Sequence, residues 1–72
     1  MNFIELLFCN DEFTFRYNNI KYSIISEKGK RSIYEEDTNK LIGEYSSNEI
    51  LLNMAIIDGR KITDIIDKIE II

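Results

Sequence analysis

Two neighbouring segments with an apolar residue at every second position constrain the fold of this chain most strongly. Their apolar positions are Phe13, Phe15 and Tyr17 in the first segment and Ile20, Tyr22 and Ile24 in the second. Asn18-Asn19 separates the segments, and asparagine tolerates the positive φ angles of a two-residue type I′ turn. The pattern predicts a β-hairpin that pairs Tyr17 with Ile20, Phe15 with Tyr22 and Phe13 with Ile24. A shift of one residue would turn all six side chains to the opposite face, so the register is strongly specified.

Two further turns are expected after this hairpin. Lys28-Gly29 marks the first, and a loop of two or four residues there places Ile24 opposite Ile33. The second lies near Asp37-Thr38-Asn39 and leads into a fourth strand. The four strands are expected to form a meander, because each follows its neighbour through a short loop.

The length of the third loop leaves two pairings open. A three-residue loop with a left-handed Asn39 places Gly43 opposite Ile33. In that pairing Leu41 and Tyr45 lie on the aromatic face. A two-residue loop places Glu44 on the aromatic face instead, which the cost of burying a carboxylate disfavours. The first pairing predicts a mostly polar reverse face with a small apolar group, made of Ile25, Tyr34 and Ile42 among Thr14, Arg16, Lys21 and Ser23.

Helical signals flank the strands. Asn2 and Glu5 have the spacing of a capping box and predict a short helix over residues 2–9. Ser46 and Glu49 have the same spacing and predict a second helix. A stripe at helical spacing predicts a third helix, with Ile62, Ile65, Ile66 and Ile69 on one side.

Together these elements predict an α+β fold within one small domain, residues 1–72. We expect a short N-terminal helix, a four-stranded antiparallel meander sheet, and two C-terminal helices that pack on one face of the sheet.

No apolar run approaches the ~18–20 residues of a membrane span, so no membrane contact is expected. A single cysteine and a start without a basic segment predict a cytoplasmic protein. A core of this size contributes only about 3–5 kcal/mol, so a homo-oligomer is a further expectation.

The composition offers little catalytic chemistry. The chain has no histidine, which excludes Ser-His-Asp and Cys-His catalysis. Cys9 ends an apolar helix, and we expect it to be a buried small apolar residue. Two acidic groups are interpreted as solvated surface: Glu35-Glu36-Asp37 with Glu44, and Asp58, Asp64, Asp67 and Glu70. Neither a metal site nor a cofactor is expected.

The segment Asp58-Gly59-Arg60-Lys61 precedes the last helix. A helix N-terminus can bind an anion, but this segment lacks the glycine spacing of a phosphate-binding loop. We interpret it as a glycine-aided turn in which Asp58 caps the last helix.

Charge is distributed unevenly along the chain. Residues 13–34 carry a net charge of +4, residues 1–12 carry −3, and residues 35–72 carry −5. A basic hairpin with aromatic residues is a candidate for nucleic-acid binding. The aromatic side chains alternate onto the expected core face, however, and the chain as a whole is acidic, with a net charge of −4. The sequence therefore predicts a protein partner rather than a nucleic acid.

Three segments carry a resemblance to a group of proteins: residues 13–24, residues 49–53, and residues 57–61 leading into 62–66. In these segments the chain resembles short uncharacterised proteins from phages and mobile elements of low-GC Gram-positive bacteria. The resemblance implies a small accessory protein that binds host machinery, and it assigns no catalytic residues.

The leading hypothesis is a non-enzymatic binding protein that regulates or inhibits a host protein, with a component of host defence as one candidate target. Its expected contact surface is the polar sheet face with its turns, namely Arg16, Lys21, Tyr34, Glu35 and Glu36, or the acidic C-terminal helix with Asp64 and Asp67. The alternative is an oligomer that sequesters a nucleotide-like anion between protomers near Arg60 and Lys61. A small hydrolase with paired carboxylates is the third hypothesis.

Overall fold

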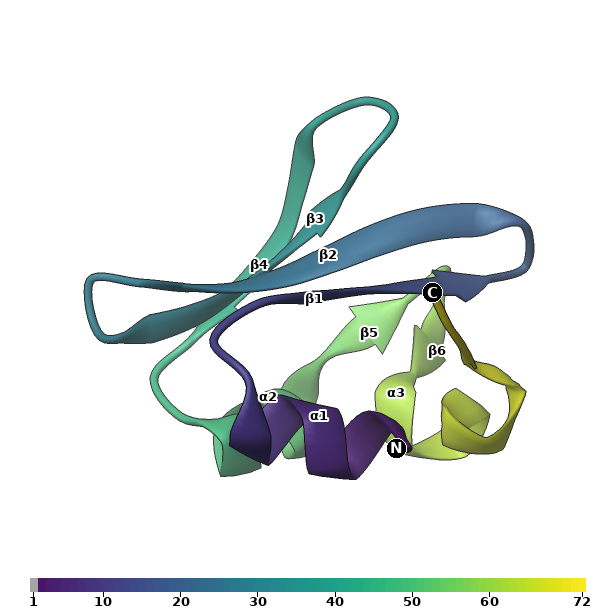
Figure 1. Cartoon of the computed structure of the whole chain (residues 1–72). Helices are drawn as coiled ribbons and strands as arrows, with labels where there is room; N and C mark the ends of the chain where they lie inside the picture. The colour runs from purple at the N-terminus through teal and green to yellow at the C-terminus, as the bar shows by residue number, and fades with distance from the viewer. Residues whose placement is uncertain (1) are drawn as a thin grey trace.

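The computed structural model describes residues 2–72; Met1, the first residue of the expected domain, lies outside the described residues. The chain forms two layers, with an antiparallel sheet above and the helices below it (Figure 1). The elements in chain order are α1 (Phe3–Cys9), β1 (Phe13–Tyr17), β2 (Ile20–Glu27), β3 (Lys30–Glu35), β4 (Lys40–Tyr45), α2 (Asn48–Met54), β5 (Ile56–Ile57), β6 (Arg60–Lys61), α3 (Ile62–Ile65), the 3₁₀ helix η1 (Ile66–Lys68) and β7 (Glu70–Ile71). The predicted α+β class is confirmed.

The predicted hairpin is confirmed in register. Tyr17 pairs with Ile20, Phe15 with Tyr22 and Phe13 with Ile24. The turn residues Asn18 and Asn19 have φ angles of 55° and 65°, as a type I′ turn requires. At the next turn Lys28 and Gly29 also have positive φ, and Ile24 pairs with Ile33 as expected.

The β3–β4 pairing contains a β-bulge that the sequence analysis did not anticipate. Gly43 pairs with Ile33 as expected, and Asn39 has a φ of 56°. The register then shifts, so that Tyr34 pairs with Leu41 and Ile42 is the extra residue. The placements of Leu41 on the aromatic face and Ile42 on the reverse face were therefore wrong. The bulge reverses the alternation, which leaves Leu41 exposed and packs Ile42 against the core.

The first two helices begin at side-chain caps. The box between Asn2 and Glu5 is present at the start of α1. In α2 the cap is Ser47, whose side chain accepts from the backbone N–H of Ile50. The box predicted between Ser46 and Glu49 is therefore wrong by one residue, because Glu49 is the second residue of the helix rather than the third.

The segment after α2 differs most from the expected one. Asp58 and Gly59, with φ angles of 52° and 78°, form a turn that joins β5 to β6 in a second, two-stranded sheet. The residue that precedes α3 is Lys61, so Asp58 does not cap that helix. The chain then ends in β7, which pairs with β1. Across the described residues the main sheet thus has five strands in the order β4-β3-β2-β1-β7, rather than four.

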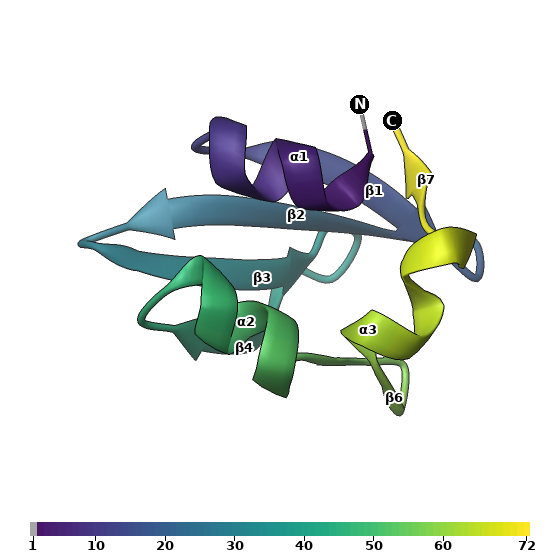
Figure 2. The ribbon, with the colours of Figure 1, turned by 90° about the horizontal axis from the view of Figure 1, so that it is seen from below.

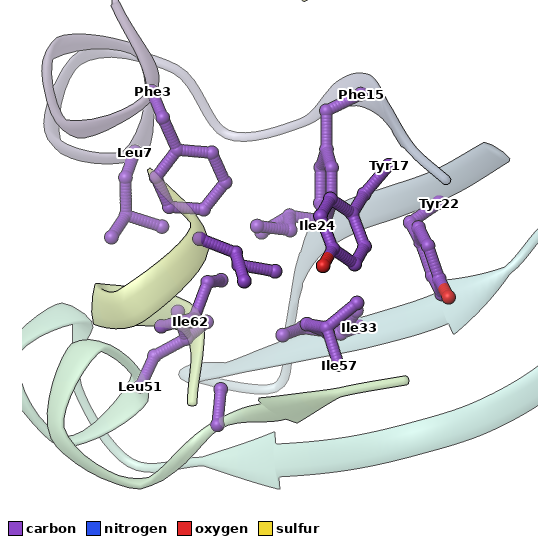
Figure 3. Close-up of a cluster of buried hydrophobic side chains, with 12 residues drawn as sticks. Phe3, Leu7, Phe15, Tyr17, Tyr22, Ile24, Ile33, Leu51, Ile57 and Ile62 are labelled. Carbon is purple, nitrogen blue, oxygen red and sulfur yellow. The ribbon is translucent and has the colours of Figure 1, made fainter. Parts of the chain in front are cut away.

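All three α-helices lie on the same face of the sheet (Figure 2). The core between the layers contains side chains from the helices, from β1, β2 and β3, and from β5 (Figure 3), namely Phe3, Leu7, Phe15, Tyr17, Tyr22, Ile24, Ile33, Leu51, Ala55, Ile57, Ile62 and Ile65. Phe3 packs edge-on against Phe15 at 5.3 Å between ring centroids.

The expectation of a buried Cys9 was wrong, because its side chain is exposed. Phe3 and Leu7 define the buried side of α1, and Cys9 lies two residues, or about 200°, beyond Leu7.

Candidate functional site: the outer face of the sheet

We use the term outer face for the sheet surface opposite the helices. Its side chains, by strand alternation, are Thr14, Arg16, Lys21, Ser23, Ile25, Glu27, Lys30, Ser32, Tyr34, Leu41, Glu44 and Glu70. Figure 1 shows this face open above the sheet, with the β3–β4 hairpin rising away from the helices on the same side. Within residues 2–72, no helix covers it.

The structure brings four of the predicted surface residues together on this face. Arg16 and Lys21 are paired positions on β1 and β2. Lys21 Nζ lies 3.8 Å from Glu36 Oε2, and Glu36 also accepts a hydrogen bond from the Ser23 hydroxyl. Arg16 forms the corresponding ion pair with Glu70 of β7 at 3.7 Å. Because these side chains are about half exposed, each pair contributes at most about 1 kcal/mol.

Tyr34 lies next to this group. It pairs with Ser23 across β2 and β3, and its hydroxyl donates to Glu27 Oε1 at 3.4 Å. Partial burial and the negative charges of Glu27 and Glu44 raise the pKa of Tyr34. The Tyr34 hydroxyl therefore lies close to two negatively charged side chains.

Glu35 does not belong to the outer face, so its grouping with Glu36 was wrong. It pairs with Tyr22, whose ring is in the core, and strand alternation directs both to the helix side of the sheet. The negative charge of Glu35 contributes, after burial and Asp58, to the raised pKa of Tyr22.

Two adjoining hollows shape the outer face. The first has a volume of about 510 Å³ and is lined by Ser23, Ile25, Glu27, Tyr34, Glu36 and Asn39. The second has a volume of about 460 Å³ and is lined by Glu12, Phe13, Thr14, Ser23, Ile24, Ile25, Glu36 and Ile72. The bulge at Ile42 accounts for the first hollow, since a bulge bends its strand and increases the local twist. The β3–β4 hairpin rises above the level of β2 (Figure 1).

The charge of these hollows differs from that expected for a basic hairpin. The carboxylates of Glu12, Glu27 and Glu36 line them, and no lysine or arginine does so within the described chain. Arg16 and Lys21 are already paired with carboxylates. The net charge of +4 over residues 13–34 thus does not produce a basic surface here.

Arg31, one of those basic residues, lies in the interior. Its side chain is only 7% exposed, and all five of its N–H donors are hydrogen-bonded. Nε donates to Asn48 Oδ1 at 2.9 Å, Nη1 to the Asp11 carbonyl at 2.7 Å and to Ser26 Oγ at 2.6 Å, and Nη2 to the carbonyls of Leu7 and Asn10 at 3.0 Å each. Arg31 therefore connects β3 to the end of α1 and to the start of α2.

The acceptors around Arg31 suit a buried cation. Backbone carbonyls at and just beyond the C-terminal end of a helix carry partial negative charge and need donors. Burial lowers the pKa of Arg31, and the charge of Asp11 opposes that shift. Arg31 was not among the predicted site residues. The signal was its position two residues before Ile33, which places it on the core face in the confirmed register.

The remaining predicted site residues lie apart from the outer-face group. Asp64 and Asp67 are exposed on α3 and η1, and Arg60 and Lys61 are exposed on β6. None of these four lines either hollow. In the described part of the chain, no three carboxylate or thiol groups converge as a metal site would require.

Among residues 2–72, no helix has both the length and the apolar character needed to cross a membrane.

Comparison of the chain with known proteins gave no match to a family model, to a curated protein or to a solved structure.

Proposed function

We propose that this chain is a non-enzymatic binding protein that regulates or inhibits a protein of its host cell, and that it makes contact through the outer face of the sheet. The observation that carries the proposal is that this face is open and hollowed while the helices cover the other one. The aromatic residues of β1 and β2, which a nucleic-acid-binding hairpin would stack on bases, are mostly in the core.

The proposal sets the area that the outer face has to supply. The chain exposes 4655 Å². A partner of standard size contributes about 800 Å² to a stable interface. One side of the sheet therefore has to supply about a sixth of the exposed surface. The sequence resemblance to phage and mobile-element proteins supports a host protein as the partner.

The experiment compares three immobilised proteins in a lysate of a low-GC Gram-positive bacterium, at several salt concentrations. The first is the natural chain. The second carries Tyr34→Ala and Glu27→Arg on the outer face, and the third carries Asp64→Arg and Asp67→Arg on the C-terminal segment. We expect the first and third to retain the same protein and the second to lose it. Absence of a specific partner for all three, or loss only in the third, would contradict the proposal.

A further inference from the structure

We infer that the two hollows form one continuous groove that binds an extended, positively charged segment of the partner protein. This inference rests on the proposed function and names the chemistry of the partner at the same face. Ser23, Ile25 and Glu36 line both hollows, so the two share a floor on β2. We call the combined feature the outer groove.

The path of the outer groove suits an extended segment. It begins at Tyr34 and Asn39 on the β3–β4 hairpin, crosses β2, and reaches Thr14 on β1 and Ile72 beyond β7. Neighbouring strands lie about 4.8 Å apart, so crossing from β3 to β7 spans about 14 Å. An extended chain covers that distance with four or five residues at about 3.3 Å each. A single small amine would occupy only part of it.

The charge of the outer groove selects for a basic occupant. Glu12, Glu27 and Glu36 line it, and within the described chain only Glu36 forms an ion pair, with Lys21 at 3.8 Å, while Glu12 and Glu27 form none. Glu27 accepts the long hydrogen bond from Tyr34, which leaves acceptor capacity on its carboxylate. A lysine or arginine side chain would therefore have carboxylates and the Tyr34 ring within one hollow, and both attract cations. A phosphate-bearing partner would be repelled.

The same groove also has apolar surface. Ile25 is partly buried in its lining, and Ile72 is 55% exposed at its end. Side chains of an extended segment point alternately to two sides, so basic and apolar residues two apart can reach the same floor. The expected segment therefore combines lysine or arginine with aliphatic residues.

A second copy of this chain is a poorer occupant than a different protein. Its exposed basic residues at the β2–β3 turn, Lys28 and Lys30, could enter the outer groove of another copy. Each copy carries a net charge of −4, so two copies repel one another, whereas a basic partner is attracted. A contact between two different surfaces would also repeat from copy to copy, either closing into a ring or continuing as an open filament.

The test selects peptides from a random displayed library on the natural chain and locates the selected peptides by backbone amide chemical-shift changes. We expect lysine and arginine to be enriched, and shift changes at Ser23, Ile25 and Tyr34. The double variant Glu12→Gln and Glu27→Gln, at two exposed positions, should weaken binding about threefold to tenfold, and less so at high salt. The matched control, Asp67→Asn, removes an exposed carboxylate outside the groove and should leave the affinity unchanged.

The outcomes separate the inference from the proposed function. Peptides that bind the outer face without enrichment of basic residues, or with equal affinity for the Gln variant, would overturn the inference and leave the proposed function intact. Peptides located only on the helices, or no binding peptides at all, would count against both. Light scattering that shows concentration-dependent self-association, abolished in the Gln variant, would identify a second copy as the occupant and overturn the inference.

Discussion

Replacement of Arg31 by methionine should remove a large part of the folding stability of this chain. The methionine side chain retains much of the aliphatic volume of arginine but has no donor for the five hydrogen bonds at that site. The carbonyls at the end of α1 would then lose their partner at a residue that is only 7% exposed. The connection between α1, β3 and α2 would be lost with it.

The expected loss is about 3–4 kcal/mol. Hydrogen bonds to a charged group contribute roughly 1.5–3 kcal/mol each. The variant, however, also avoids the cost of removing a guanidinium from water, which is several kcal/mol, and water can reach those acceptors that are only partly buried. A chain of this length has a total stability of about 4–10 kcal/mol. The urea midpoint should therefore fall by about 2 M, with a slope near 1–2 kcal/mol per molar.

Urea unfolding followed by far-ultraviolet circular dichroism measures this change. Arg31→Lys keeps the charge and three donors, so it should lose about half as much and remain measurable if the methionine variant does not fold. Arg16→Met is the control, because Arg16 is half exposed and its loss should cost less than about 1 kcal/mol. A methionine variant within about 1 kcal/mol of the natural chain would contradict this role of Arg31. It would mean that burying the charge costs as much as its hydrogen bonds contribute.

Three further changes test other features. Gly59→Ala should lower the free energy of unfolding in urea by about 1–2 kcal/mol, because the φ of Gly59 is +78°, a left-handed conformation that alanine disfavours. The space around Gly59 is open, so the added methyl group itself meets no neighbour; an unchanged free energy of unfolding would contradict this prediction. Burial raises the pKa of Tyr22, so the unfolded chain releases this proton first and stability should fall above a pH of about 10. Tyr22→Phe should reduce the decrease of the urea midpoint at alkaline pH. The same decrease in the variant and the natural chain would contradict this prediction. Ser32→Ala removes a buried hydroxyl that has no partner among the described residues, so the free energy of unfolding should stay equal or rise by up to about 1 kcal/mol; a larger loss would reveal a partner.

The central strands could be predicted because side-chain period and turn chemistry agree there. Asn18-Asn19 and Lys28-Gly29 each match the turn that the alternating apolar residues require, so one register satisfies both. The third turn lacked this agreement. A three-residue loop and a four-residue loop followed by a bulge both place Gly43 opposite Ile33, and only the structure separates them. Leu41 and Ile42 exchanged faces for that reason.

The candidate site was predictable in its residues but not in its shape or charge. Alternation placed Arg16, Lys21 and Tyr34 on one face, and the structure agrees. Net charge summed along the chain was misleading, because it treats Arg31 as surface when five acceptors hold it inside. The hollows depend on sheet curvature, and the bulge that produces it has no signal in the alternating pattern.

The strand β7 has a consequence for association between copies of this chain. Without it, β1 would be an edge strand that exposes backbone groups beside aromatic side chains, and such edges pair readily with other chains. Pairing of Phe15 with Ile71 and of Arg16 with Glu70 occupies the middle of that edge. The opposite edge, β4, carries a bulge and the charged residues Lys40 and Glu44, which also discourage pairing. Because β7 joins the sheet from the far end of the sequence, its pairing with β1 closes a long loop, and we expect aggregation to compete mainly before that pairing forms.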